Sequence, residues 1–186
     1  MEEEIKKSLQ ILSSGGLLLY PTDTVWGIGC DANNVDAVKK IYKLKNRDDS
    51  KALVCLVNGK EMLNRHIPKI SNEILKIASN TQKPTTVIYN KPMGFAKNLI
   101  AQDDTIAIRM VKHKFCETLI SQFGKPIVST SANLSGEPTP KSFVEISKPI
   151  LKGVDYVVNL QKEKIATKAS TIIKINSDGT IQTIRK

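Results

Sequence analysis

The sequence has few of the residues on which metal-binding and disulfide-stabilised proteins depend. Its three cysteines, Cys30, Cys55 and Cys116, are odd in number and widely separated, and no CxxC pair occurs. Neither a disulfide framework nor a zinc knuckle is therefore expected. The two histidines, His66 and His113, have no partner motif nearby, and a lone histidine is more often structural than catalytic. The thiols are expected to be reduced, as they are in a cytoplasmic protein.

Long apolar runs and targeting signals are also missing. No stretch approaches the ~20 apolar residues that a membrane-spanning helix needs. The first four residues, Met1 to Glu4, are acidic where a secretory signal would be basic and then apolar. We therefore expect a cytoplasmic location and no membrane partner. The common phosphate-loop, dinucleotide, nucleophile-elbow and HExxH motifs are absent as well, so a phosphate site in this chain would be of an unusual kind.

Aromatic residues make up only 5% of the 186 residues, so the core must consist mostly of Ile, Leu and Val. The length fits one domain, which we expect to span residues 1–186. What the chain does have is positive charge, with 28 Lys and Arg against 18 Asp and Glu, a formal net charge of +10. This surplus is compatible with an anionic partner such as a nucleotide or nucleic acid, and equally with a solvated lysine surface.

Hydrophobic periodicity predicts a mixed α/β fold. Helical spacing predicts helices over 2–13, 60–66, 71–80 and 114–123, and a further helix that Asn33 or Asn34 caps and that runs into a lysine-rich last turn. Short apolar or β-branched runs predict strands at 17–20, 52–57, 85–89, 105–109, 127–130, 156–158, 170–175 and 180–184. Residues 176–179 have the composition of a hairpin turn between the last two strands.

Three polar loops follow these elements, and they occupy residues 20–29, 45–51 and 129–136. The first combines hydroxyls, a carboxylate and glycines, the second is a cationic cluster, and the third is dense in small hydrogen-bonding groups. Each loop alone is as compatible with an ordinary turn as with a site. Together, a cationic cluster and a loop of hydroxyl and amide groups provide what a nucleoside triphosphate site needs.

These loops carry a family resemblance. From about Leu17 to Arg185 the sequence resembles the YrdC/TsaC family, the L-threonylcarbamoyladenylate synthases of tRNA modification. The matching segments are Tyr-Pro-Thr-Asp-Thr-Val-Trp-Gly at 20–27, Lys-x-Arg at 45–47 and Ser-Thr-Ser-Ala-Asn-Leu-Ser-Gly at 129–136. The resemblance implies a twisted open mixed α/β sheet with flanking helices and a large, basic, concave cavity. Because the chain ends at Lys186, it resembles the short, single-domain form of the family.

The resemblance also implies roles for individual residues. The signature pairs KxR and SxN fall on Lys45, Arg47, Ser131 and Asn133, which would be the catalytic residues. The ATP side would comprise these four residues with Lys51, Thr105, Ser129 and Arg185. The threonine side would comprise Thr22, Thr24, Arg109 and Ser170.

The implied reaction joins L-threonine, bicarbonate or CO2, and ATP into threonylcarbamoyl-AMP and pyrophosphate. No protein nucleophile is needed, because the threonine amine captures CO2 and the resulting carbamate attacks the α-phosphorus. Mg²⁺ is expected on the phosphates, held by substrate oxygens and water with no metal ligand from the protein. The product would pass to a transferase complex that acts on adenosine 37 of tRNA.

Two alternatives from other functional classes stay open at this point. The family is associated with double-stranded RNA, and a basic concave sheet could bind tRNA or double-stranded RNA through its phosphates. A paralogue with the same fold could also carry out a different carbamoyl- or acyl-adenylate chemistry. The intact KxR and SxN pairs favour the synthase over both.

Overall fold

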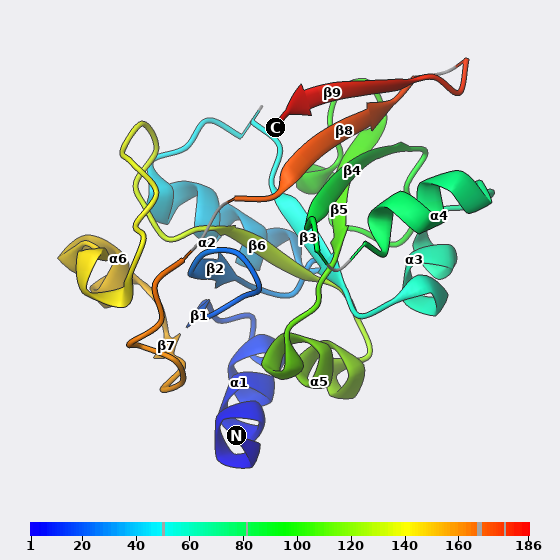
Figure 1. Cartoon of the computed structure of the whole chain (residues 1–186). Helices are drawn as coiled ribbons and strands as arrows, with labels where there is room; N and C mark the ends of the chain where they lie inside the picture. Colours follow the sequence, from blue (N-terminus) through cyan, green and yellow to red (C-terminus); the bar gives the residue numbers. More distant parts are fainter. Residues whose placement is uncertain (50, 81, 167–168, 177) are drawn as a thin grey trace.

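The computed structural model describes residues 1–49, 51–80, 82–166, 169–176 and 178–186. Within these ranges, nine strands form one mixed sheet in the order β7-β1-β2-β6-β3-β5-β4-β8-β9 (Figure 1). The strands are listed here with their bounds: β1 Leu18–Tyr20, β2 Gly27–Gly29, β3 Val54–Val57, β4 Thr85–Asn90, β5 Thr105–Met110, β6 Ile127–Ser131, β7 Tyr156–Val157, β8 Thr171–Ile175 and β9 Ile181–Arg185.

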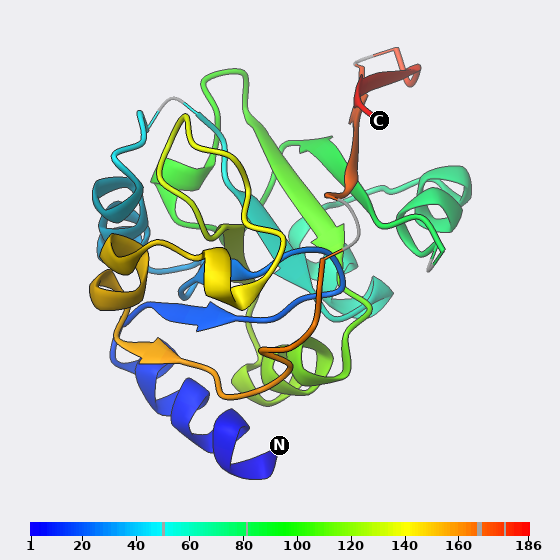
Figure 2. The ribbon, with the colours of Figure 1, turned by 60° about the vertical axis from the view of Figure 1, so that its left-hand side comes forward.

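Helices flank this sheet. They are α1 Glu2–Ser13, α2 Val35–Lys45, α3 Lys60–His66, α4 Asn72–Ala78, α5 Lys114–Phe123 and α6 Lys148–Gly153, with two 3₁₀ turns at Lys97–Leu99 and Phe143–Glu145. Helices α1 and α5 contact each other at the end of the molecule that holds the N-terminus, and the C-terminus lies at the opposite end (Figures 1 and 2). In the described residues, no helix combines the length and apolar character that crossing a membrane requires.

The local sequence explains most of these elements. Asn34 caps α2 as predicted, because its side-chain oxygen accepts hydrogen bonds from the backbone N–H groups of Asp36 and Ala37. Helix α5 ends at Gly124, whose φ of 73° lies in the left-handed region that glycine adopts without strain. The eight predicted strands and the five predicted helices are confirmed, with ends that differ by at most two residues. The predicted turn at 176–179 includes residue 177, which lies outside the described residues, but β8 and β9 do pair antiparallel.

Strand β2, helix α6 and the two 3₁₀ turns were not predicted. Strand β2 lies in the segment interpreted as a polar loop, because Gly-Ile-Gly has a low strand propensity. A Cβ added to Gly29 would lie 2.3 Å from the carbonyl oxygen of Val128, so glycine permits the close contact between β2 and β6. Helix α6 was missed because it has only six residues, too few for a periodic pattern.

Strand order determines where the site lies. Strand β2 is third in the sheet and β9 is last, yet residues from both line the same cavity. The sheet must therefore curl around that cavity, and Figure 2 shows the β8–β9 hairpin standing out from the rest of the sheet. The core is one cluster and is mostly aliphatic, as predicted, with Leu19, Ile28, Leu56 and Leu119 fully buried.

Candidate functional site

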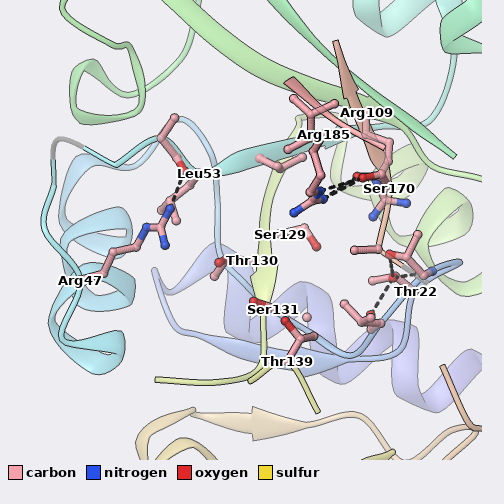
Figure 3. A pocket seen from close by; sticks show the side chains of 17 residues that line it. Thr22, Arg47, Leu53, Arg109, Ser129, Thr130, Ser131, Thr139, Ser170 and Arg185 are labelled. Atoms are coloured by element: carbon pink, nitrogen blue, oxygen red, sulfur yellow. Dashed lines mark hydrogen bonds between the residues drawn. The ribbon is translucent and has the colours of Figure 1, made fainter. Parts of the chain in front are cut away.

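A cavity of about 220 Å³ is lined by residues from strands β2, β3, β5, β6, β8 and β9 and from the loops between the elements (Figure 3). This volume is below the about 300–1,000 Å³ typical of pockets that enclose a drug-sized ligand, so a ligand as long as ATP would extend out of it. The described residues that line it are Thr22, Thr24, Val25, Gly27, Arg47, Ala52, Leu53, Val54, Arg109, Ser129, Thr130, Ser131, Thr139, Ala169, Ser170, Ile172 and Arg185.

The cavity is basic. Arg47, Arg109 and Arg185 all contribute to its wall, and none of the described residues that line it is acidic. The three arginines come from the segment after α2, from β5 and from β9, so only the folded sheet brings them together. Arginine presents planar N–H donors that match carboxylate and phosphate oxygens. A cavity with this wall is suited to a ligand with more than one anionic group.

Arg109 is fixed by a buried ion pair. Its Nη1 donates to Oδ1 of Asp23, and the two side chains are only 5% and 9% exposed. The second carboxylate oxygen of Asp23 accepts from the backbone N–H of Lys112 at 3.4 Å. Asp23 therefore fixes the orientation of the Arg109 guanidinium, whose other N–H groups remain available to a ligand in the cavity. Sequence reasoning gave Asp23 no role, although its position inside Pro-Thr-Asp-Thr is a signal that could have found it.

The two threonines of the first loop form a local hydroxyl pair. Thr22 Oγ1 donates to the carbonyl of Val25 at 2.7 Å and accepts from the backbone N–H of Thr24 at 3.1 Å. Because the hydroxyl proton of Thr22 is donated to Val25, Thr24 must be the donor in the 3.1 Å contact between the two hydroxyls. The lone pairs of Thr24 Oγ1 then remain as acceptors. Both residues line the cavity, where this acceptor suits an amine or hydroxyl group of a ligand.

Ser170 connects three elements. Its hydroxyl lies 2.8 Å from that of Thr86 on β4, and its carbonyl accepts from Nε and Nη2 of Arg185 at 3.1 and 2.8 Å. Partial burial and the charge of Arg109 lower the pKa of Arg185, which still lies far above neutrality in any protein. Thr86 carries no sequence signal, since it contacts Ser170 only through the parallel pairing of β4 and β8.

Arg47 lies at the opposite side of the cavity from this group (Figure 3). Its Nε and Nη2 donate to the carbonyls of Lys51 and Ala52 at 3.3 and 3.0 Å, which holds the guanidinium at the mouth. The side chain of Lys51 is exposed and is not part of the cavity wall. The predicted ATP residue Lys51 therefore contributes its backbone carbonyl to the position of Arg47.

Strand β6 supplies the floor between these two sides. Ser129 and Ser131, both predicted, line the cavity, and so do Thr130 and Thr139, which sequence reasoning missed. A Cβ on Gly27 of the neighbouring strand would lie 2.9 Å from Ser129 Oγ, so glycine keeps this part of the cavity open. Thr130 stands inside the Ser-Thr-Ser segment, which is a signal that could have found it.

Two signature residues lie outside the cavity wall. Lys45 is 1% exposed, and its Nζ donates to the carbonyls of Ser131, at 2.5 Å, and Asn133. Burial and the charge of Arg47 lower the pKa of Lys45 to about 8. Asn133 Nδ2 donates to the carbonyls of Leu134 and Glu137, at 3.0 and 2.7 Å.

Thr105 is the remaining predicted residue, and it is also outside the wall. Its hydroxyl donates to Asp103 at 2.6 Å, and Asp103 in turn forms an ion pair with Lys174. Thr105 begins β5 and Arg109 lies four residues further along, which is about 13 Å in a strand. The structure thus brings eight of the twelve predicted site residues into one cavity wall, and it leaves Lys45, Lys51, Thr105 and Asn133 outside it.

Comparisons with known proteins show which family the chain belongs to. The family model Sua5/YciO/YrdC, described as telomere recombination, matches residues 10–186. A putative threonylcarbamoyl-AMP synthase from Methanocaldococcus jannaschii is 36% identical over 97% of this chain and 86% of its own length. The threonylcarbamoyl-AMP synthase of Pseudoalteromonas translucida is 32% identical over 85% of this chain and 86% of its own.

The fold is also similar to that of a solved structure. The P. abyssi Sua5 protein, crystallised in complex with L-threonine, superposes with a TM-score of 0.85 at 25% identity. The superposition covers all of this chain and 54% of the Sua5 chain, so this chain spans about half the length of that protein.

Proposed function

Because the chain belongs to the Sua5/YciO/YrdC family, whose model covers residues 10–186, we propose that it is a threonylcarbamoyl-AMP synthase. The enzyme forms threonylcarbamoyl-AMP and pyrophosphate from L-threonine, bicarbonate or CO2, and ATP. The observation that carries the proposal is the meeting of three arginines and several hydroxyl groups in one cavity whose described wall holds no acid.

The chemistry explains why such a wall suffices. The threonine amine adds to CO2 and loses a proton, which gives a carbamate. A carbamate oxygen then bonds to the α-phosphorus of ATP, and the bond from that phosphorus to the bridging oxygen breaks to release pyrophosphate. Two anions must approach each other and charge grows on the leaving group, so preorganised cations and N–H donors provide the main stabilisation.

Threonine fits the side of the cavity that holds Arg109. The guanidinium is oriented by Asp23 and can pair with the carboxylate of the amino acid. The acceptor on Thr24 Oγ1 can receive a hydrogen bond from the amine or hydroxyl of the substrate. The hydroxyl of Ser170 completes this side.

ATP fits the opposite side and the mouth. Arg47, with two of its nitrogens bound to backbone carbonyls, keeps further N–H groups for phosphate oxygens. Ser129 and Ser131 add hydroxyls from the floor, and Arg185, which lines the same cavity, would lie between the two substrates. The charge of Arg185 can offset the repulsion between carbamate and triphosphate.

Mg²⁺ would enter with ATP. The described wall offers hydroxyls but no carboxylate, and in the described part of the chain no three acidic, His or Cys side chains gather into a metal-holding group. These residues fit a metal that phosphate oxygens and water hold, in which the ion neutralises phosphate charge. We further propose a cytoplasmic enzyme whose product is used by a transferase complex on adenosine 37 of tRNA.

The test is pyrophosphate release from ATP, Mg²⁺, L-threonine and bicarbonate, with each component omitted in turn. Pyrophosphate release that requires every component supports the synthase proposal, and release that does not depend on threonine contradicts it. Arg47→Ala should lower the rate about 10²–10³-fold, as loss of one preorganised donor typically does. The matched control is Arg65→Ala, since Arg65 is an exposed arginine on α3 and its loss should leave the rate unchanged.

A further inference from the structure

The two signature motifs contact each other directly. Lys45 ends helix α2, and its Nζ donates to the backbone carbonyls of Ser131 and Asn133. Its own carbonyl accepts from the backbone N–H of Ser135 at 2.8 Å. Three hydrogen bonds thus join one residue of the KxR motif to the segment 131–137, called here the SxN loop.

Within each motif, the two named residues have different surroundings. Arg47 and Ser131 line the cavity, whereas Lys45 and Asn133 do not. Lys45 is 1% exposed, so its ammonium group is enclosed by the SxN loop. Asn133 directs its Nδ2 to the carbonyls of Leu134 and Glu137, which closes the same loop on itself.

Burial of the Lys45 ammonium group has an energetic cost, which its hydrogen bonds to the SxN loop offset. Burial of a lysine ammonium disfavours its charged form unless hydrogen-bond acceptors surround it, and here two carbonyls do so. Removing the ammonium would leave the carbonyl of Asn133 without the partner that the structure gives it. The carbonyl of Ser131 would keep its bond to the backbone N–H of Asn133 at 2.9 Å. The SxN loop therefore depends on Lys45 mainly around Asn133.

We propose that Lys45 and Asn133 are positioning residues that hold the SxN loop against the end of α2. They thereby set the place of Ser131 relative to Arg47, the two motif residues that face the cavity. Any effect on catalysis rests on the proposed function. The effect on the loop itself does not, because it concerns only contacts within the chain.

The direct test is hydrogen exchange of the ligand-free protein. In Lys45→Met, the amides of Asn133, Ser135 and Glu137 should exchange at least about tenfold faster than in the wild type, because the loop loses two bonds. In the matched control Arg47→Met, the same amides should exchange at the wild-type rate. Unchanged exchange in Lys45→Met would overturn the proposal.

A second variant approaches the loop from the other side. Asn133→Ala removes the bonds to Leu134 and Glu137 and leaves α2 untouched, so it should speed exchange at the same amides. If Lys45→Met does not fold, this variant still decides the question, since unchanged exchange would show that the loop does not depend on Asn133.

Rescue by a neutral donor separates positioning from charge. Lys45→Gln supplies two N–H donors without charge, so it should slow exchange and raise pyrophosphate release at least about fivefold over Lys45→Met. If protection returns and release stays at the Lys45→Met level, Lys45 acts through its charge and the proposal is wrong. If the wild type itself shows no threonine-dependent release, the proposed function fails, while the exchange results still decide the role of Lys45.

Discussion

The ion pair between Asp23 and Arg109 makes a quantitative prediction about stability. Both side chains are nearly buried, at 9% and 5% exposure, so Asp23→Ala leaves the guanidinium in a poorly solvated place without its counter-charge. Removing one partner of a buried pair typically costs about 3–5 kcal/mol. We expect a loss near the lower end, about 3 kcal/mol, because Arg109 also borders a cavity that water can enter.

The assay is urea unfolding at pH 7, in which the midpoint should fall while the slope stays constant. The matched control is Asp36→Ala, because Asp36 pairs with Lys39 at 3.5 Å while both side chains are exposed, at 86% and 67%. Such an exposed pair contributes about 0–1 kcal/mol. The double variant Asp23→Ala with Arg109→Met should be less destabilised than the sum of its two single variants, since it leaves no unpaired charge.

Two results would refute this reasoning. If Asp23→Ala loses as little stability as Asp36→Ala, water in the cavity solvates the Arg109 guanidinium well enough to replace its partner. If the two single losses add in the double variant, Asp23 and Arg109 are not coupled, and Asp23 does not orient the arginine.

Further predictions concern pH and a glycine. Because the pKa of Lys45 is lowered to about 8 from 10.5, the unfolded chain binds more protons between these values. The contribution of Lys45 to stability should therefore rise by up to about 3 kcal/mol from pH 8 to 10.5. Unfolding at pH 7–10 should show this rise in the wild type relative to Lys45→Met, and parallel curves would contradict it. Gly29→Ala should lower the thermal midpoint strongly, since its Cβ would lie 2.3 Å from a backbone oxygen. The control Gly59→Ala should not, because the space around Gly59 is open. Equal midpoints for the two variants would contradict the close contact of β2 with β6.

The polar loops could be found from the sequence because their residues are contiguous. Thr22, Thr24, Ser129 and Ser131 each stand in a dense run of hydroxyl groups, and they do line the cavity. Asp23 and Thr130 belong to the same runs but received no role, since nothing local distinguishes a residue that points into a cavity from its neighbour. Thr139 lies outside any run, and the loop that follows β6 brings it to the wall.

The sequence by itself determined most of the helices and strands, since caps, periodicity and β-branched runs act over a few residues, and it determined which loops carry polar groups. Only the tertiary structure decided which members of those loops share a surface. Arg47, Arg109 and Arg185 lie far apart in the chain and meet because the sheet order places β9 beyond β4 and curls it back toward β6. Lys45 resembles an ordinary solvated lysine at a helix end, where a cation suits the dipole. It is buried because a loop more than eighty residues further along the chain folds over it and supplies the carbonyls that accept its hydrogen bonds.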